Sequence, residues 1–354
     1  MSLPASFKAA ILTRAGGPLE RVTLEADGVA VKITATAINP VDWKLGAAPH
    51  LFLGDNLPAI LGTDAAGTIS AVGSGVSNFS VGERVFFQGR SRDFDTASFQ
   101  EYARTPAAVV GYTPAHISDE QAAGVSLAGI TAAIGLYHTV GAALPAQWDA
   151  EGGSAGKGKA IVVLGGSSSV GQYTVQLARL SGLEHIVTNA SAPHRESLQK
   201  LGAHVVLDRK THNNAADFLA AVGDDLELAL VYDTISSIET QVLAVEILQA
   251  AKKVRGDNGH VVCLLLPEEK AVQLGNKTEG GARAVVIKNI IAVGPAKEYR
   301  YVSEPFYPNV SKWLASGELV PNKTVVVEGG IASIDDALNK QQAGVSGVKV
   351  VVKF

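Results

Sequence analysis

An apolar run that ends in a turn of small residues constrains this chain more than any other stretch. Ala160–Leu164 reads AIVVL, and such a β-branched run bounded by glycine is typical of a buried parallel strand. Apolar residues then recur at helical spacing from Val170 to Ala178. A strand, a tight turn and a helix start can present backbone N–H groups and a positive helix end to a pyrophosphate. The sequence therefore predicts a dinucleotide site at Gly165, Gly166, Ser167, Ser168, Ser169, Val170 and Gly171.

This turn departs from the usual G-x-G-x-x-G motif because Ser168 takes the place of the middle glycine. Serine is small enough for a close approach of the backbone, and it adds a hydroxyl donor. The alternative interpretation is a Gly/Ser turn between a strand and a helix that binds no ligand.

The next expected strand, Ile186–Ala190, ends without a carboxylate. An NAD site places an acidic residue about twenty residues beyond the last glycine, where it binds the ribose hydroxyls. The polar side chains found here instead are those of Asn189, Ser191, His194 and Arg195. A guanidinium suits phosphate oxygens, whereas a carboxylate would repel a 2′-phosphate. We therefore expect NADPH as the cofactor; the alternative is that Arg195 is a solvated residue in the first turn of the next helix.

Length and composition narrow the class of protein. The 354 residues exceed one ordinary domain, and 47% apolar against 18% charged residues fit an enzyme with a large core. No apolar run reaches the ~18 residues of a membrane-spanning helix, and the N-terminus does not read as a secretion signal. Cys263 is the only cysteine, which excludes an internal disulfide and fits a reducing compartment. A net charge of −4 without a dense Lys/Arg cluster gives no sign of nucleic-acid or membrane binding, so the cytosol is the expected location.

Two kinds of pattern divide the chain. The first part carries short β-rich runs bounded by turn residues, as in small antiparallel barrels: Lys8–Thr13, Val29–Ala37, Gly67–Val72, Arg84–Gln88 and Phe99–Arg104. Ser118-Asp-Glu-Gln is a helix N-terminus signature and opens a helical stretch to Tyr137. Strands and helices then alternate, with strands expected at Ala160–Leu164, Ile186–Asn189, Val205–Leu207, Leu228–Tyr232, Val261–Leu265 and Val285–Ile291.

The β-rich pattern returns after Gly294, with a helix around Phe306–Ser316 and strands at Lys323–Val327 and Val348–Phe354. Six alternating strands are what a doubly wound dinucleotide-binding domain requires. The expected fold class is therefore α/β, with a Rossmann NADP-binding domain at residues 126–299 inserted into a β-rich domain made of residues 1–125 and 300–354. Substrate would bind in the cleft between the two domains.

In this order the segments resemble the medium-chain dehydrogenase/reductase superfamily over essentially the whole chain. Within it they resemble the zinc-free branch, which includes quinone oxidoreductases and the enoyl reductases of fungal polyketide pathways. The resemblance implies a GroES-like fold for the β-rich domain. The segments that carry it are Ala37–Lys44 (AINPVDWK), Leu61–Gly67 (LGTDAAG), Val81–Val85 (VGERV), Leu127–Ala132 (LAGITA), Gly165–Gly171 (GGSSSVG), Leu201–Ala203 (LGA) and Ser346–Val350 (SGVKV).

The resemblance also bears on zinc. Zinc-dependent relatives place Cys, His and Cys ligands at positions that correspond here to Asn39, Thr63 and Ala128, which do not form an adequate set of ligands. The four-cysteine lobe of those relatives has no counterpart in this sequence. We therefore expect no metal site, and no alcohol oxidation assisted by a Lewis acid.

The activity that the resemblance implies is NADPH-dependent reduction of a C=C bond conjugated to a carbonyl. Hydride from the nicotinamide reaches the β-carbon and a proton reaches the α-carbon, while the protein positions the reactants and stabilises charge on the carbonyl oxygen. Quinone reduction is an alternative in the same broad class. A protein that binds NADPH without catalysis, or has a structural role, is an alternative of another class.

The resemblance assigns four residues to the reaction. Lys44, in the loop after a strand, is the cationic candidate near nicotinamide and substrate, or else a surface lysine. Thr131 faces the nicotinamide ribose or carboxamide, or else bonds a preceding helix carbonyl. Asn39, held extended by Pro40, places its amide beside nicotinamide and substrate, and Asp42 is an orienting or helix-capping residue. The proton donor stays open among Lys44, a tyrosine and water.

Further cofactor contacts are expected at Arg209, Leu265 and Lys349. Many zinc-free relatives have a tyrosine after the aspartate of the third strand, whereas Arg209 follows Asp208 here and faces either the phosphate or solvent.

Tyr137 and His138 are expected to pack in the core rather than to act as acid or base, and Cys263 is expected to be a buried small hydrophobe. The expected partners are an α,β-unsaturated carbonyl compound, a second copy joined through Val285–Val293, and a polyketide synthase.

Overall fold

The structure, a computed structural model, describes residues 11–12, 25–47, 59–91, 93–150 and 152–354. The chain divides into two compact units: a β-rich unit made of Met1–Leu127 and Val293–Phe354, and a Rossmann unit made of Ala128–Ala292. The expected boundaries follow residues 125 and 299, whereas the units change after residues 127 and 292. Helix α4 (Ser126–Tyr137) therefore begins in the β-rich unit and continues into the Rossmann unit.

The Rossmann unit contains a six-stranded parallel sheet with the order β10-β9-β8-β11-β12-β13. The strand order reverses between β8 and β11, which is the doubly wound arrangement that binds ligands at the carboxyl ends of the strands. The expected α/β fold class is confirmed. The strands are β8 (Lys159–Leu164), β9 (His185–Ala190), β10 (Val205–Asp208), β11 (Glu227–Asp233), β12 (Gly259–Cys263) and β13 (Val285–Asn289).

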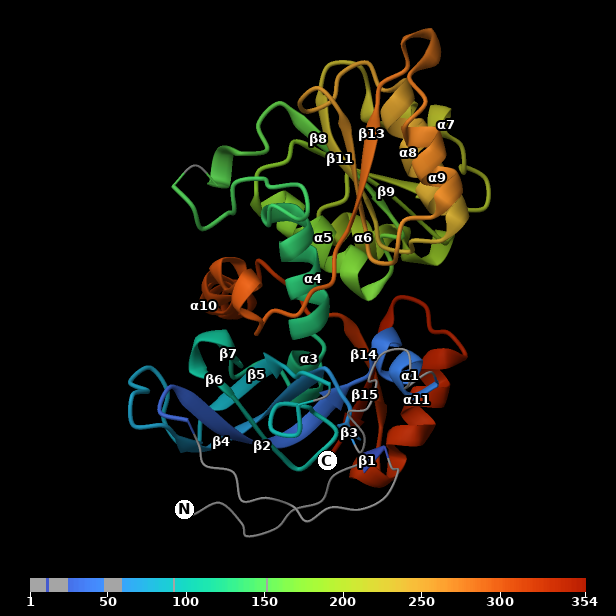
Figure 1. Ribbon diagram of the computed structural model, residues 1–354. Coiled ribbons are helices and arrows are strands. Elements are labelled where there is room, and N and C mark those ends of the chain that lie inside the picture. Colours follow the sequence, from blue (N-terminus) through green and yellow to red (C-terminus); the bar gives the residue numbers. More distant parts are fainter. Residues whose placement is uncertain (1–10, 13–24, 48–58, 92, 151) are drawn as a thin grey trace. The chain divides into compact units, whose positions relative to one another are not determined.

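Helices cover both faces of this sheet. Helices α7, α8 and α9 lie together on one face (Figure 1), where Phe218, Leu248 and Ala271 pack against strand residues such as Val231 and Val261. All five side chains are almost completely buried, so apolar burial holds this layer together. The helices of the unit besides α4 are α5 (Ser169–Leu180), α6 (Arg195–Leu201), α7 (Ala215–Val222), α8 (Ile238–Ala250) and α9 (Glu269–Gly275).

The β-rich unit is built on a sheet with the order β14-β15-β2-β4-β5-β7, in which β6 also pairs with β2. Among the described strands of this sheet, only the pair β14–β15 is parallel, and a separate short sheet pairs β1 with β3. The strands are β1 (Ile11–Leu12), β2 (Gly28–Ala37), β3 (Ala59–Ile60), β4 (Asp64–Val72), β5 (Arg84–Gln88), β6 (Tyr102–Pro106), β7 (Val110–Tyr112), β14 (Lys323–Val327) and β15 (Val348–Lys353).

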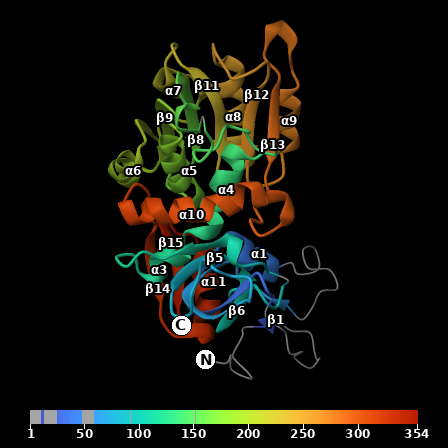
Figure 2. The ribbon, with the colours of Figure 1, turned by 90° about the vertical axis from the view of Figure 1, so that its left-hand side faces the viewer.

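The helices in the described part of the β-rich unit are α1 (Pro40–Ala47), α3 (Asp119–Ala123), α10 (Arg300–Ser316) and α11 (Ile334–Gln342). Helices α1 and α11 lie side by side (Figure 1), and Figure 2 shows α10 along its length. Tyr307 on α10 is fully buried, and its hydroxyl oxygen accepts a hydrogen bond from the Gln88 N–H at the end of β5.

The structure differs from the expected elements at several points. The helical stretch opened by Ser118 is interrupted at Gly124 and becomes α3 and α4. The expected helix start is confirmed, and Ser118 forms a capping box there with Gln121. Lys44 lies in helix α1 rather than in a loop, because Pro40 supplies the fixed φ of a first helical position. Helix α11 was not expected; it buries only Ile334 and Ala337, too few apolar residues for a clear pattern.

Of the expected strand Lys8–Thr13, only Ile11 and Leu12 lie within the described residues, and both are in β1. None of the helices in the described part of the chain combines the length and the hydropathy that crossing a bilayer requires.

Candidate active site and cofactor site

The turn Gly165–Gly171 leaves the carboxyl end of β8 and opens α5. Gly165 has a left-handed backbone with φ of 81°. A Cβ atom on Gly166 would lie 2.1 Å from Thr188 Oγ1, and one on Gly171 would lie 2.4 Å from the carbonyl oxygen of Gly165. Only glycine therefore fits at these points. The start of α5 carries the positive end of the helix, and Ser168 caps it by accepting from the Gly171 N–H. Shape and chemistry both fit a pyrophosphate.

The Ser168 hydroxyl is engaged inside the protein. Its oxygen accepts a hydrogen bond from the Gly171 N–H at 2.9 Å and lies 2.8 Å from Thr234 Oγ1. Thr234 directs its single hydroxyl proton to the carbonyl oxygens of Leu164 and Gly165, at 2.8 and 3.0 Å. With the Thr234 proton on the Leu164 carbonyl oxygen, Ser168 donates its own proton to Thr234. The hydroxyl that was expected as an added donor thus has a partner within the protein.

Asn189 at the end of β9 holds the turn in place. Its side-chain Oδ1 accepts from the Gly165 N–H at 2.8 Å, and its carbonyl oxygen accepts from the Gly166 N–H at 3.0 Å. The amide expected to face the cofactor thus uses its oxygen to fix the backbone that would cradle the pyrophosphate.

The other expected cofactor residues follow the ends of β9 and β10. Ser191 and His194 are half-buried, and Arg195 is exposed as the first residue of α6. Arg209 is also exposed, and its N–H donates to the Ala190 carbonyl oxygen at 3.0 Å, which joins the two strand ends. The structure therefore brings these residues to one edge of the sheet.

Two further charged residues, Glu196 and Lys210, lie near this edge of the sheet. The first carboxylate after β9, Glu196, pairs with Lys200 at 2.6 Å on the surface of α6. Lys210 was not expected from the sequence, but it is exposed next to Arg209. Two adjacent cations, Arg209 and Lys210, follow the end of a strand, and this pattern in the sequence could have indicated Lys210 as a candidate cofactor residue.

Apolar side chains follow the ends of β11 and β12. Ile235 covers the turn, since a Cβ on Gly165 would lie 2.5 Å from its Cδ1. Leu265 is 45% exposed, and its carbonyl oxygen accepts from the Cys263 thiol. Burial raises the pKa of that thiol to about 12, so Cys263 is an unreactive core residue, as expected.

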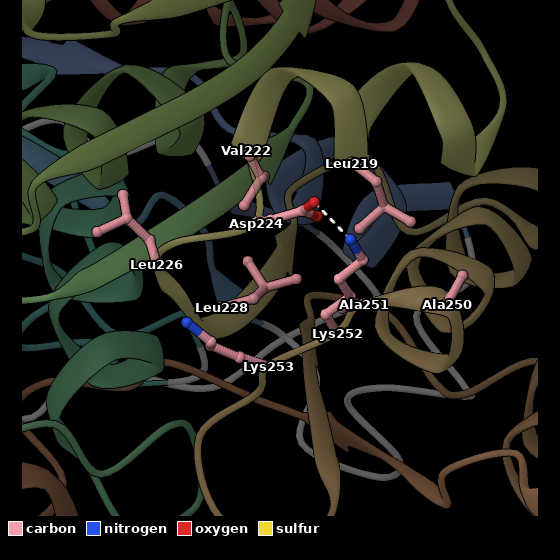
Figure 3. A pocket seen from close by; sticks show the side chains of 10 residues that line it. Leu219, Val222, Asp224, Leu226, Leu228, Ala250, Ala251, Lys252 and Lys253 are labelled. Carbon is pink, nitrogen blue, oxygen red and sulfur yellow. Dashed lines mark hydrogen bonds and ion pairs between the residues drawn. The ribbon is translucent and has the colours of Figure 1, made fainter.

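Figure 3 shows a pocket of the Rossmann unit, lined by residues from the ends of α7 and α8 and from the amino end of β11. Its lining includes Leu219 and Val222 from α7, Ala250 from α8 and Leu228 near the amino end of β11, with an ion pair between Lys252 and Asp224 at its border. Doubly wound folds bind ligands at the carboxyl ends of their strands. The pocket is therefore separate from the cofactor site.

The β-rich unit contains a buried polar cluster around Asn39, which we call the Asn39 cluster. Asn39 Nδ2 donates to Thr63 Oγ1 at 3.1 Å and to Asp64 Oδ2 at 2.9 Å. Its Oδ1 accepts from the Lys349 ammonium. Both amide hydrogens are therefore donated within the cluster, and the side chain is fixed from three sides. The cluster consists of Asn39, Asp42, Thr63, Asp64 and Lys349.

Asp42 lies in the first turn of α1 and fixes the start of that helix by hydrogen bonds. Its Oδ2 accepts from the Asn39 N–H at 2.7 Å, and its Oδ1 accepts from the Thr63 hydroxyl at 3.0 Å. Burial raises the pKa of Asp42 to about 7, although these hydrogen bonds act in the opposite direction. The contacts agree with the expected orienting and capping role.

Asp64 and Lys349 form the charged centre of the cluster. Their Oδ2 and Nζ atoms are 3.2 Å apart, and the two side chains are 0% and 3% exposed. Burial raises the pKa of Asp64, and the nearby Lys349 opposes that shift. Lys349, which was expected to contact the cofactor, lies buried between Asn39 and Asp64, and these two side chains are the acceptors that a buried ammonium needs. Asp64 Oδ1 also accepts from the Leu127 N–H at 2.6 Å, in the first turn of α4.

The two candidate catalytic side chains lie in different units. Lys44 is half-buried on α1 of the β-rich unit, and its Nζ is 5.6 Å from the centre of the Trp43 ring. Thr131 is buried on α4 in the Rossmann unit, and its carbonyl oxygen accepts from the Tyr232 hydroxyl at 2.7 Å.

The expected packing roles of Tyr137 and His138 are confirmed. The Tyr137 hydroxyl pairs with Ser181 Oγ at 2.7 Å, and burial raises its pKa above the ordinary value. His138 is 5% exposed, and its Nδ1 accepts from the Val140 N–H.

The described residues contain no group of three or more His, Cys, Asp or Glu side chains placed to hold a metal ion. At the three positions that correspond to zinc ligands, Asn39 and Thr63 are hydrogen-bonded within the Asn39 cluster, and Ala128 carries no ligand atom in its side chain.

Comparisons with known proteins agree with this architecture. Residues 25–126 match the family model of the alcohol dehydrogenase GroES-like domain. The trans-enoyl reductase himH of Aspergillus japonicus is 31% identical over 351 residues, which cover 96% of this chain and 93% of that protein. The lovastatin nonaketide synthase enoyl reductase component lovC of Aspergillus terreus is 31% identical over 94% of this chain and 90% of its own length.

A solved structure shares the same fold. An alcohol dehydrogenase superfamily protein from Novosphingobium aromaticivorans superposes with a TM-score of 0.76 at 24% identity, over 99% of this chain and 100% of that one. With the doubly wound sheet, the GroES-like unit and two near full-length relatives above 30% identity, this chain belongs to the medium-chain dehydrogenase/reductase superfamily, in the enoyl-reductase-like group that includes the fungal trans-enoyl reductases.

Proposed function

We propose that this chain reduces the C=C bond of α,β-unsaturated carbonyl compounds with NADPH and without zinc. The likeness to himH over nearly the whole chain carries the proposal, since himH is named a trans-enoyl reductase. A geometric argument supports it: the turn Gly165–Gly171 has the backbone and helix end that a pyrophosphate requires.

NADPH rather than NADH is proposed from the chemistry at the ends of β9 and β10. Arg195 and Arg209 are exposed at this edge, and no carboxylate occurs between Asn189 and Arg195. Two guanidinium groups favour a 2′-phosphate by charge and by paired hydrogen bonds. Asn189, Ser191 and His194 would complete the adenosine end of the site.

The proposed roles of the remaining residues follow from their contacts. Bound NADPH would supply the hydride. Lys44 would stabilise charge on the substrate carbonyl oxygen, because an ammonium group interacts more strongly with an oxyanion than with a neutral carbonyl. Thr131 would orient the nicotinamide end, and Leu265 would provide apolar contact. Asn39 and Asp42 would act as positioning residues, since their polar groups are engaged within the Asn39 cluster.

We propose zinc independence because Asn39 and Thr63, at two of the three positions that correspond to zinc ligands, are already hydrogen-bonded within the Asn39 cluster. A zinc ion would need deprotonated sulfur, imidazole or carboxylate ligands. Asn39 instead donates both amide hydrogens to neighbours, and Thr63 bonds to Asp42.

A substrate screen tests the proposal directly. We expect NADPH oxidation with enals, enones or enoyl thioesters, in protein whose measured metal content is far below one ion per chain. Turnover restricted to quinones would replace the proposal with quinone reduction. NADPH binding without turnover on any activated alkene or quinone would indicate a non-catalytic protein.

The role of Lys44 has a matched control on the neighbouring helix. We expect Lys44→Ala to lower kcat/KM by about 10²-fold, the usual range for loss of one oxyanion donor, while NADPH affinity is retained. Lys340→Ala removes an exposed lysine from α11 and should leave the rate unchanged. Equal rates in the two variants would exclude the proposed role.

We also propose two protein partners and a cellular location for this chain. LovC is named as a component of a nonaketide synthase, which supports a polyketide synthase as a partner here. A homodimer through β13 is proposed because β13 is the last strand in the order of the sheet; sedimentation of the intact chain would test it. A lone cysteine supports the cytosol as the location.

A further inference from the structure

The hydroxyl pair of Ser168 and Thr234 joins the dinucleotide turn to the loop that follows β11. Ser168 Oγ and Thr234 Oγ1 are 2.8 Å apart, and Ser168 Oγ also accepts from the Gly171 N–H. The Ser168 side chain is thus held by one acceptor and one donor on different segments. Rotation to another staggered rotamer would break both hydrogen bonds.

Thr234 is itself held firmly. It directs its hydroxyl proton to the Leu164 and Gly165 carbonyl oxygens, and its N–H donates to the Leu164 carbonyl oxygen. The preceding residue, Asp233, is fully buried and accepts from the N–H groups of Ile235 and Ser236. The loop therefore offers Ser168 an acceptor in a fixed position.

The next residues extend this support to β12. Ser236 has a left-handed backbone with φ of 61°, which is uncommon for a residue with a side chain. Its hydroxyl donates to the Asp233 carbonyl oxygen at 2.9 Å and accepts from the Leu264 N–H at 2.8 Å. The ends of β8, β11 and β12 are thus linked by side-chain hydrogen bonds.

The usual motif has glycine at the position of Ser168 because the backbone there must approach the pyrophosphate closely. The Ser168 backbone, at φ −64° and ψ 160°, does not itself require glycine. What serine adds is a Cβ and a hydroxyl that could occupy the space of the phosphate oxygens. Two hydrogen bonds fix the direction of that hydroxyl.

We propose that Thr234 is a positioning residue for the cofactor: it holds the Ser168 hydroxyl away from the pyrophosphate and so allows serine in place of the motif's middle glycine. The proposal rests on the proposed binding of NADPH. It predicts that the need for Thr234 disappears when residue 168 carries no side chain.

The test measures NADPH and NADH affinity by fluorescence titration of the full chain. Thr234→Val, which keeps the shape and removes the hydroxyl, should weaken both cofactors by the same factor of about three to ten, the range of one net hydrogen bond. The factor is shared because the pyrophosphate is common to both. Thr234→Ser should bind like the unmodified chain.

The decisive arm is the double variant Ser168→Gly with Thr234→Val. If Thr234 acts by holding the Ser168 side chain, the double variant regains the affinity that Thr234→Val lost. If the pair only stiffens the turn, removal of the Ser168 cap from α5 weakens binding further, and the proposal is overturned. Unchanged affinity in Thr234→Val also overturns it.

Two controls separate folding and function from this effect. Thr174→Val removes a hydroxyl that bonds only within α5, to the Val170 carbonyl oxygen, and should change neither affinity. Melting temperatures report folding, and Thr234→Ala serves as a second hydroxyl-free variant if Thr234→Val unfolds. An unmodified chain that binds neither cofactor would refute the proposed function, and this inference with it.

Discussion

The Asn39 cluster and the dinucleotide turn are both polar, but they use their polar groups in opposite ways. In the Asn39 cluster the side chains satisfy one another, and both amide hydrogens of Asn39 have partners. In the turn, side chains such as Asn189 and Ser168 fix the backbone, while the first N–H groups of α5 remain directed out of the helix. The polar groups of the cluster are therefore engaged with one another, whereas the turn has the backbone form of our proposed pyrophosphate site.

The largest expected effect is on the Asn39 cluster. Asp64→Ala leaves the Lys349 ammonium buried without its carboxylate and removes the acceptor of the Leu127 N–H. Breaking a buried pair from one side costs about 3–5 kcal/mol, and chemical denaturation would measure it. Asp335→Ala removes an exposed aspartate from α11 and should have little effect. A loss of stability below about 1 kcal/mol for Asp64→Ala would mean that Asp64 and Lys349 do not form a buried ion pair in the folded protein.

The second effect concerns the turn. Gly171→Ala places a methyl group 2.4 Å from the Gly165 carbonyl oxygen, so the turn must shift. We expect a loss of stability of about 1–3 kcal/mol together with weaker NADPH binding. Gly153→Ala is the matched control, because a methyl group there meets nothing within 4 Å. Full NADPH affinity in Gly171→Ala would show that the turn is not the pyrophosphate site.

A third effect distinguishes the two ends of the cofactor site. Arg195→Ala should weaken NADPH binding by about tenfold, or about 1.4 kcal/mol, and leave NADH binding unchanged, since only NADPH carries the 2′-phosphate. Isothermal titration with both cofactors measures this. Lys200→Ala, on the same helix but paired with Glu196, is the control. Equal losses for NADPH and NADH would contradict the assignment of Arg195.

The smallest effect is a pH dependence of the Asn39 cluster. The pKa of Asp42 is raised to about 7 in the folded protein, from an ordinary value of 3.8. The folded state therefore binds a proton that the unfolded state has released. The stability from this proton is complete below pH 3.8 and is lost as the pH rises through about 7. Between about pH 6 and 7.5 we expect a loss of roughly 1 kcal/mol.

Comparison with Asp42→Asn isolates this contribution. Asparagine cannot titrate, so the variant should lack this fall in stability. Burial lowers the pKa of His204, so that histidine acts in the opposite direction, with stability lost as the pH falls below about 6.5, and it does so in both proteins. Parallel pH profiles of the two proteins would contradict the assignment to Asp42.

The same contrast explains what the sequence could predict. The turn is local: its strand, its glycines and its helix are contiguous, so their spacing predicts the structure. The Asn39 cluster joins residues as distant as Asn39 and Lys349. No spacing rule relates those positions, so the sequence does not predict the pair of Lys349 with Asp64.

Two local features have physical explanations as well. The partner of the Ser168 hydroxyl could not be predicted because Thr234 is 66 residues away in sequence. Lys44 looked like a loop residue because Pro40 interrupts a strand pattern, although it also begins helix α1. The strand Arg84–Gln88 was predicted with its observed bounds, since its apolar run ends sharply at polar residues.

The most direct test of the central claim is transfer of deuterium from NADPH labelled at C4 of the nicotinamide to an enoyl thioester, using dialysed protein with a chelator present. The account predicts label at the β-carbon of the saturated product, at a rate that the chelator does not change. Loss of turnover with the chelator and its return on addition of zinc would contradict the account, as would unlabelled product.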